Sequence, residues 1–272
     1  GDPVRIYHFG ILALLWISSL FIAYCFAWFN RPIRLGILFA VFIFAGFQLN
    51  DSYRKVLYRD RSFFGPLLVR MDPQEKYVLF YHGTTLHGAQ SRLPGEQKKP
   101  LTYFTLEGPF GQIMSAFHEL HPAPSRIAIT GLGAGNIAAY GRAGDALDYF
   151  EIDPHVAQIA RDTPYFSFLK DTPSTVSITL GDARLTLANI PDHAYDVIIM
   201  DAFSSGSIPV HLVTLEAFRM VKSKLHPGGL LIYQISNRFL NLEPVLAGFA
   251  EEAGWKALVN RHLNVSFAQR RE

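Results

Sequence analysis

The stretch Ile127-Ala-Ile-Thr-Gly-Leu-Gly-Ala-Gly135 joins a run of apolar residues directly to a glycine-rich segment. Such a run predicts a buried strand that ends in a tight turn, where glycine tolerates positive φ angles and lets a ligand approach the backbone closely. The helix expected after the turn would offer free N–H groups. A dinucleotide fingerprint would have another glycine at position 136, where this chain has Asn136. The pattern GxGxG is typical of sites for nucleosides without a pyrophosphate, with a purely structural turn as the alternative.

From Glu107 onward, helical patterns alternate with buried strands. Strands are predicted at Arg126–Thr130, Ala146–Ile152, Val176–Leu180, Tyr195–Met200 and Gly229–Ile235, with helices between them such as Pro154–Arg161 and Leu212–Leu225. The alternation favours a mostly parallel sheet with helices on both faces. We therefore expect an α/β fold with a Rossmann-like, methyltransferase-type doubly wound sheet. Such a sheet would finish with two further strands, and Lys256–Arg261 is a candidate for one of them.

Three of these strands end in a carboxylate at the same expected edge of the sheet. Glu151 ends the second strand and could bind the two hydroxyls of a ribose. Asp182 follows the third strand and could accept a hydrogen bond from the amino group of an adenine. Asp201 follows the fourth strand, faces the expected crevice and is our candidate catalytic base. The alternatives are a solvated strand end for Glu151 and a helix cap or loop hydrogen bond for Asp201.

The segment from Phe63 to Tyr103 contains short β patterns, such as Leu67–Arg70 and Tyr77–Tyr81, separated by turn residues. It predicts a small β meander ahead of the large sheet. Two histidines five residues apart, without a cysteine or nearby carboxylate, are poorly spaced for a metal, so no metal site is predicted. The residues that could instead line the mouth of a substrate site are His82, His87, Tyr103 and His211. Turn-stabilising hydrogen bonds are the alternative for the two histidines of the meander.

Two uncharged runs occupy the N-terminal part, over residues 9–30 and 35–50. The first has 22 residues, which at ~1.5 Å per residue spans the ~30 Å hydrocarbon core of a bilayer. A transmembrane helical hairpin is the preferred interpretation, and a signal peptide or two buried globular helices are the alternatives. The sequence thus predicts three parts: the hairpin over residues 1–60, a small β domain over 61–105 and a Rossmann-like nucleoside-binding domain over 106–272.

Charges and cysteine content bear on the location of the chain. The flanks of the predicted hairpin carry more basic residues than its loop, and the flanking ones are Arg5, Arg54, Lys55, Arg59 and Arg61. Positive residues favour the cytoplasmic side of a membrane, so we expect a bacterial inner-membrane protein whose soluble part faces the cytoplasm. The single cysteine, Cys25, agrees with a reducing compartment. A net charge of +2 indicates no nucleic-acid partner, while the bilayer and other membrane subunits are expected partners.

The same residues carry a resemblance to a known family. The segments Tyr81–Gln90, Gly131–Gly135, Glu151–Asp153, Gly181–Ala183 and Asp201–Pro209 together look like the spermidine synthase-like (aminopropyltransferase-type) family, and most like its bacterial membrane-fused branch. The resemblance covers roughly residues 60 to 260. It implies a meander and a Rossmann domain that bind decarboxylated S-adenosylmethionine and transfer its aminopropyl group to a diamine. It also implies that Gln90 touches the nucleoside, Glu151 the ribose, Asp182 the adenine and Asp201 the attacking amine.

Two positions depart from the family pattern. An aspartate of the glycine loop is replaced by Ala134, and a second aspartate after the fourth strand is replaced by Ser204. Because those anions hold cationic amines, each loss removes charge-assisted hydrogen bonds worth about 1.5–3 kcal/mol. Removing acid beside the tail of the cofactor also relieves repulsion of the carboxylate in intact S-adenosylmethionine. The two departures therefore argue against polyamine synthesis and favour a methyl or aminocarboxypropyl donor.

The sequence accordingly favours a membrane-anchored transferase with an S-adenosylmethionine-type donor and an unidentified small-molecule acceptor, an amine among the candidates. The alternative is a non-catalytic accessory subunit of a larger membrane complex that retains a Rossmann scaffold. Because the chain starts at Gly1 without a methionine, we expect it to be an excerpt of a longer protein.

Overall fold

The structure is a computed structural model that describes residues 31–52, 55–161, 164–202, 209–236 and 240–261. The chain divides into two compact units, Gly1–Arg54 and Lys55–Glu272. The smaller unit contributes one described helix, and the larger unit contributes two sheets with their helices.

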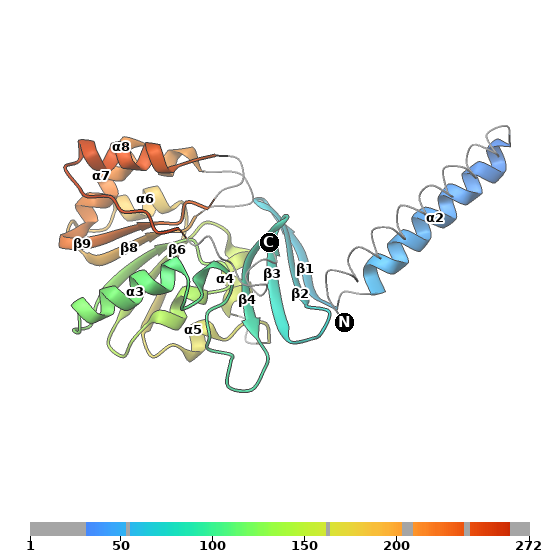
Figure 1. Cartoon of the computed structure of the whole chain (residues 1–272), viewed down its shortest axis with the longest axis horizontal. Coiled ribbons are helices and arrows are strands. Elements are labelled where there is room, and N and C mark those ends of the chain that lie inside the picture. The colour runs from blue at the N-terminus through green and yellow to red at the C-terminus, as the bar shows by residue number, and fades with distance from the viewer. Residues whose placement is uncertain (1–30, 53–54, 162–163, 203–208, 237–239, 262–272) are drawn as a thin grey trace. The chain divides into compact units, whose positions relative to one another are not determined.

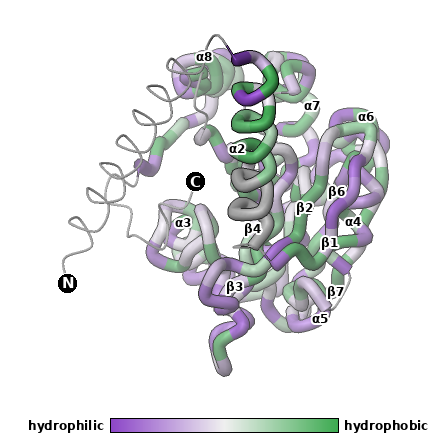
Figure 2. The backbone as a smooth tube through the Cα atoms, turned by 90° about the vertical axis from the view of Figure 1, so that its right-hand side faces the viewer, coloured by the Kyte–Doolittle hydropathy of each residue, from purple (hydrophilic) through white to green (hydrophobic). Residues whose placement is uncertain are grey.

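The helix of the smaller unit is α2 (Pro32–Ser52), which begins at a proline as helices commonly do. Figure 2 shows that its described turns are mostly hydrophobic after the arginines at its start. The second predicted span, 35–50, falls on α2, and the first, 9–30, lies outside the described residues. Among the helices of the described part, none is long and apolar enough to cross a membrane. The predicted hairpin is therefore not supported, and its second run of 16 residues is shorter than the roughly 20 that a span needs.

The larger unit opens with a four-stranded antiparallel meander in the order β1-β2-β3-β4. Its strands are β1 (Val56–Ser62), β2 (Gly65–Met71), β3 (Tyr77–His82) and β4 (Thr85–Ser91). Both sequence-predicted β segments lie inside β2 and β3. Alternate residues of β2 are buried, which gives the sheet one face toward the core. Gly83, with φ of 63°, forms the tight turn between β3 and β4.

The second sheet is parallel throughout, with the strand order β7-β6-β5-β8-β9. Its strands are β5 (Arg126–Thr130), β6 (Ala146–Glu151), β7 (Thr175–Leu180), β8 (Tyr195–Met200) and β9 (Leu225–Tyr233). This confirms the predicted Rossmann-like α/β fold. The predicted strand at Lys256–Arg261 is wrong, because residues 255–261 form no regular structure and Leu258 is 97% exposed.

Helices cover both faces of the parallel sheet (Figure 1). They are α3 (Pro109–Leu120), α4 (Pro154–Arg161), α5 (Phe168–Asp171), α6 (Ala183–Ala188), α7 (Leu215–Lys224) and α8 (Glu243–Glu252), with the short 3-10 helices η1 (Thr102–Phe104), η2 (Asn136–Tyr140) and η3 (Val210–Leu212). Ile129 and Tyr149 face one core, which Met114 of α3 shares. Ala128 and Phe150 face a second core, which Leu187 of α6 shares. Each strand thus alternates its side chains between two apolar layers.

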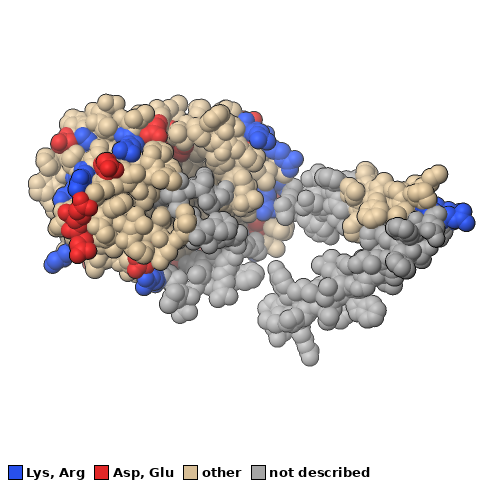
Figure 3. Space-filling model, turned by 90° about the horizontal axis from the view of Figure 1, so that it is seen from above, with Lys and Arg blue, Asp and Glu red and all other residues tan. Residues whose placement is uncertain are grey.

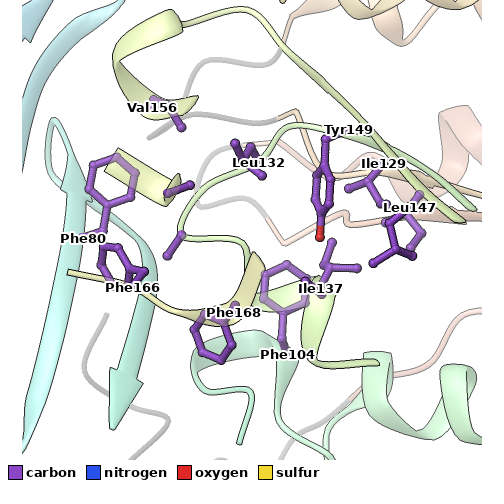
Figure 4. Close-up of a cluster of buried hydrophobic side chains, with 14 of the residues drawn as sticks. Phe80, Phe104, Ile129, Leu132, Ile137, Leu147, Tyr149, Val156, Phe166 and Phe168 are labelled. Carbon is purple, nitrogen blue, oxygen red and sulfur yellow. The ribbon is translucent and has the colours of Figure 1, made fainter. Parts of the chain in front are cut away.

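The meander packs onto the first of these cores. Figure 4 shows Phe80 of β3 close to Phe166, within a cluster that continues to Tyr149 of the parallel sheet. The ring centroids of Phe80 and Phe166 are 6.2 Å apart. Both side chains are fully buried, so the two sheets share one hydrophobic cluster.

The helix expected after the glycine turn is not an α-helix. The structure has the five-residue 3-10 helix η2, entered through Gly135 in a left-handed conformation and ended at Gly141. Asn136 within it is buried, and its side-chain amide donates to Ala89 O at 3.0 Å. The residue that breaks the dinucleotide pattern therefore ties the turn to β4.

Candidate functional site

The glycine turn is shaped by the backbones that approach it. Gly131 and Gly133 have φ of 87° and 53°, which glycine adopts without strain. A side-chain carbon at position 131 would lie 2.7 Å from Asp201 O, and one at 133 would lie 2.8 Å from His87 O. Gly135, with φ of 81°, faces the side chain of Leu169 instead. The turn is thus held between the end of β8 and strand β4.

Glu151, at the end of β6, is bonded to the turn. Its Oε2 accepts from Leu132 N at 2.9 Å, and its Oε1 accepts from Asp153 N at 2.8 Å. Burial raises the pKa of Glu151, although these N–H groups oppose the rise. The side chain therefore lies beside the glycine turn, as predicted for a ribose ligand. Each carboxylate oxygen can accept a second hydrogen bond, so contact with a ribose remains compatible with this geometry.

Asp182, after β7, caps the following helix. Its Oδ1 accepts from Arg184 N at 2.8 Å and Leu185 N at 3.1 Å. Its Oδ2 lies 2.8 Å from Nε2 of His211. His211 was expected at the mouth of the substrate site, and the structure places it against the predicted adenine contact instead, because η3 brings it to the end of β7.

Asp201, after β8, lies beside the glycine turn and Tyr103. Its backbone N–H donates to Thr130 O at 3.0 Å, which continues the parallel ladder. The hydroxyl of Tyr103 lies 3.4 Å from Asp201 Oδ2. Removal from water raises the pKa of Asp201 to about 8; the Tyr103 hydrogen bond opposes the rise and the charge of Glu151 adds to it. The structure thus brings together the predicted base and one predicted substrate residue. Ser204 lies outside the described residues.

Gln90 does not face the glycine turn. Its amide donates to Gln97 O and to Ser167 Oγ, both at 2.8 Å, and its oxygen accepts from Ser167 N at 2.9 Å. The side chain is therefore committed to the protein. A nucleoside contact from Gln90 would require these bonds to break, so its predicted role stays a prediction.

The two histidines of the meander lie side by side, with ring centroids 5.5 Å apart. His82 Nε2 lies 3.0 Å from Phe64 O, which is a structural contact. His87 Nε2 is buried and has no hydrogen-bond partner within the described part of the chain. The residues that the structure describes hold no cluster of three His, Cys, Asp or Glu side chains suited to a metal ion.

A cavity of about 1070 Å³ opens beside Asp201 and Tyr103, between α3, β9, α8 and residues 255–261. Its walls are largely apolar and include Phe110, Phe117, Leu231, Tyr233 and Trp255. These residues were not predicted as site residues, because apolar side chains on helices and strands are indistinguishable from core residues in the sequence. Asp201 and Tyr103 are also among the residues that line this cavity.

Sequence comparison shows which known proteins the chain is similar to. No protein-family model matches the chain. Over 117 residues the chain is 37% identical to the polyamine aminopropyltransferase of Vibrio vulnificus, a match that covers 41% of this chain and 38% of the relative. The similarity to the spermidine synthase-like family is confirmed. The chain spans well under half the length of that relative, and nothing in the match supports the finer assignment to a membrane-fused branch.

Spermidine synthases of known structure share the fold of the chain. The enzyme from Thermotoga maritima superposes with a TM-score of 0.52 at 18% identity, covering 73% of this chain and 64% of that one. A spermidine synthase solved with the transition-state analogue AdoDATO gives a TM-score of 0.54 at 17% identity, with the same coverage. At these identities the likeness shows the fold alone.

The structure also explains one departure from the spermidine synthase-like pattern. Ala134 is 1% exposed, and a side-chain carbon at Gly88 of β4 would lie 2.5 Å from Ala134 Cβ. Strand β4 therefore covers the position at which the family pattern has an aspartate.

Proposed function

We propose that the chain is a transferase that binds a nucleoside sulfonium donor, S-adenosylmethionine or its decarboxylated form, and passes a group to a small-molecule acceptor. The observation that carries this proposal is the spatial order of three carboxylates and the glycine turn along one edge of the parallel sheet. In spatial order they are Asp182 after β7, Glu151 at the end of β6, the glycine turn after β5 and Asp201 after β8. Open α/β sheets bind ligands at this edge, beside the strand where the order reverses.

This order fits the length of the donor. An adenine near Asp182 and a ribose near Glu151 bring the sulfonium over the glycine turn, where close backbone approach is possible. The reacting carbon then lies between the turn and Asp201. The relationship to aminopropyltransferases supports a donor of this kind.

Asp201 has the properties of a base for this reaction. The acceptor's lone pair attacks a carbon attached to the sulfonium, the carbon–sulfur bond breaks, and sulfur keeps the electron pair as a neutral thioether. The acceptor then gives its proton to Asp201. With a pKa of about 8, Asp201 becomes the ionised base as the pH rises toward 8, and the ionised carboxylate then binds that proton more tightly than a carboxylate whose pKa is near 4. Most of the rate enhancement would come from holding donor and acceptor in line.

The nucleoside product tests this proposal without knowledge of the acceptor. The full chain is incubated with either donor and a bacterial metabolite extract, and the nucleosides are separated. Methyl transfer leaves S-adenosylhomocysteine, or its decarboxylated analogue from the decarboxylated donor, whereas aminopropyl or aminocarboxypropyl transfer leaves methylthioadenosine. Either product, formed by the wild type and lost in Asp201→Asn, supports the proposal. Formation of neither product from either donor overturns it.

A second candidate function is that of a non-catalytic accessory subunit. The observation that favours it is that the carboxylates of Glu151 and Asp182 already bind their own chain. The loss of acid at Ala134 points the same way. Donor binding without any nucleoside product would support this function.

Location at the bacterial inner membrane, with the larger unit in the cytoplasm and the bilayer and other membrane subunits as partners, remains part of the proposal. It is supported by the uncharged run over residues 9–30 and by exposed apolar side chains on α2, such as Ile37 and Phe44. A fluorescent protein fused to the C-terminus should fluoresce, and the fusion should be recovered in the membrane fraction. A chain that stays in the soluble fraction after lysis contradicts this location.

A further inference from the structure

One buried polar group beside the glycine turn is not used by the proposed reaction. His87 comes from β4, and its backbone oxygen meets Gly133, the middle glycine of the turn. Its Nε2 is buried and has no hydrogen-bond partner among the described residues. Buried polar side chains nearly always have a hydrogen-bond partner, so a buried polar atom without one indicates a contact with a group outside the described residues, such as a ligand.

Two aromatic rings lie beside the imidazole of His87. The ring of Phe80 lies 6.3 Å away and that of His82 lies 5.5 Å away, both measured between centroids. Burial lowers the pKa of His87 to about 4, and the charge that His82 can carry adds to this. At neutral pH the imidazole is therefore uncharged, with one N–H donor and one nitrogen acceptor.

The strand order places His87 against one part of the donor. With the adenine at β7 and the ribose at β6, the chain of atoms beyond the sulfur lies over the turn at β5. Strand β4 crosses this turn at His87 and Gly88, and Gly88 packs on Ala134. His87 thus belongs to the strand that covers the side of the turn where the family pattern has an anion.

We propose that His87 binds the amino-acid end of the donor's tail and makes the site favour the zwitterionic tail of S-adenosylmethionine over the cationic tail of the decarboxylated form. The proposal rests on the proposed function, since it concerns the same donor. A neutral N–H can donate to the carboxylate of the zwitterion. The cationic tail has no such carboxylate. Because the turn carries Ala134, the protein also offers its ammonium group no anion at that position.

Calorimetry on the full chain tests this role with three ligands: S-adenosylmethionine, its decarboxylated form and methylthioadenosine, which has no such tail. The variant His87→Phe removes the polar atom and keeps a ring, and His87→Gln keeps a polar end. The matched control is His118→Phe on α3. Among the described residues, His118 Nε2 is also buried without a hydrogen-bond partner, but its charged neighbours Arg142 and Asp145 lie at the opposite edge of the sheet.

In the wild type, S-adenosylmethionine should bind more tightly than its decarboxylated form. His87→Phe should lower the affinity for S-adenosylmethionine about tenfold and change the affinity for methylthioadenosine by less than about twofold. The difference in affinity between the two donors should therefore become smaller. His87→Gln should keep most of the affinity, and His118→Phe should change none of the three. Equal loss for all three ligands, or no loss for S-adenosylmethionine, overturns the role of His87. If methylthioadenosine fails to bind the wild type, the proposed function itself fails.

Discussion

The backbone N–H of Leu132 donates a hydrogen bond to Glu151 Oε2 at 2.9 Å, so a buried carboxylate ties the glycine turn to the end of the neighbouring strand. The other oxygen of Glu151 accepts from Asp153 N. A single side chain therefore fixes two backbone segments at the edge where the nucleoside is proposed to bind.

This relationship predicts that Glu151 has a structural role as well as a ligand-binding one. Glu151→Gln replaces one acceptor oxygen with an N–H₂ group that faces a backbone N–H. We expect a loss of about 1–3 kcal/mol in the free energy of unfolding, together with loss of nucleoside binding. Denaturant unfolding measures the first effect. Glu252→Gln, which breaks an exposed pair with Arg219, should cost less than about 1 kcal/mol, and equal costs for the two variants would contradict this role.

The turn itself should not tolerate a side chain. Gly131→Ala places a carbon 2.7 Å from Asp201 O at a φ of 87°, and we expect a loss of about 1–3 kcal/mol in stability. Gly248→Ala in α8 has open space around it and should stabilise by about 0.5–1 kcal/mol. Opposite shifts in the midpoint of thermal unfolding are the expected outcome, and a stabilised Gly131→Ala would show that the turn has another conformation.

Restoring the family aspartate should not restore aminopropyl transfer. Ala134→Asp puts a carboxylate at a position that is 1% exposed and that Gly88 covers. We expect destabilisation by several kcal/mol. Ala123→Asp, at an exposed position, should change stability by less than about 0.5 kcal/mol. A folded Ala134→Asp chain that binds the decarboxylated donor more tightly than the wild type would argue against this account of β4.

The raised pKa of Asp201 predicts a pH-dependent stability difference. Between about pH 4 and pH 8 the folded state holds a proton on Asp201 that the unfolded state releases, so stability falls as the pH rises. Asp201→Asn removes this titration. The variant and the wild type should be similar in stability near pH 4, and the variant should become the more stable of the two by pH 9. Denaturant midpoints across this range measure the difference, and parallel curves would contradict the raised pKa.

Long apolar runs made most of the fold predictable. The strand at Arg126–Thr130 was placed at its observed bounds, because a buried parallel strand is continuously hydrophobic. Strand β9 begins at Leu225, four residues before the predicted start, since Pro227 and Gly228 look like strand breakers yet belong to the strand. The prediction of a helix after the glycine turn was wrong, because the segment between Gly135 and Gly141 forms only a short 3-10 helix.

The placement of the candidate site residues was predictable where it depends on position at a strand end, and unpredictable where it depends on partners distant in the sequence. The positions of Glu151 and Asp201 could be predicted from the strands that precede them. Gln90 is held by Ser167, which lies 77 residues away in the sequence. His211 pairs with Asp182, which belongs to a different connection of the sheet. No local pattern encodes such pairs, because they depend on how loops return to the sheet.

The central claim is that the edge formed by the glycine turn, Glu151 and Asp182 binds a nucleoside sulfonium donor. Hydrogen–deuterium exchange on the full chain, with and without S-adenosylmethionine or its decarboxylated form, tests this most directly. The account predicts that at least one donor slows exchange in residues 131–136, 151–153 and 182–185 together. Unchanged exchange in all three segments with both donors would contradict it.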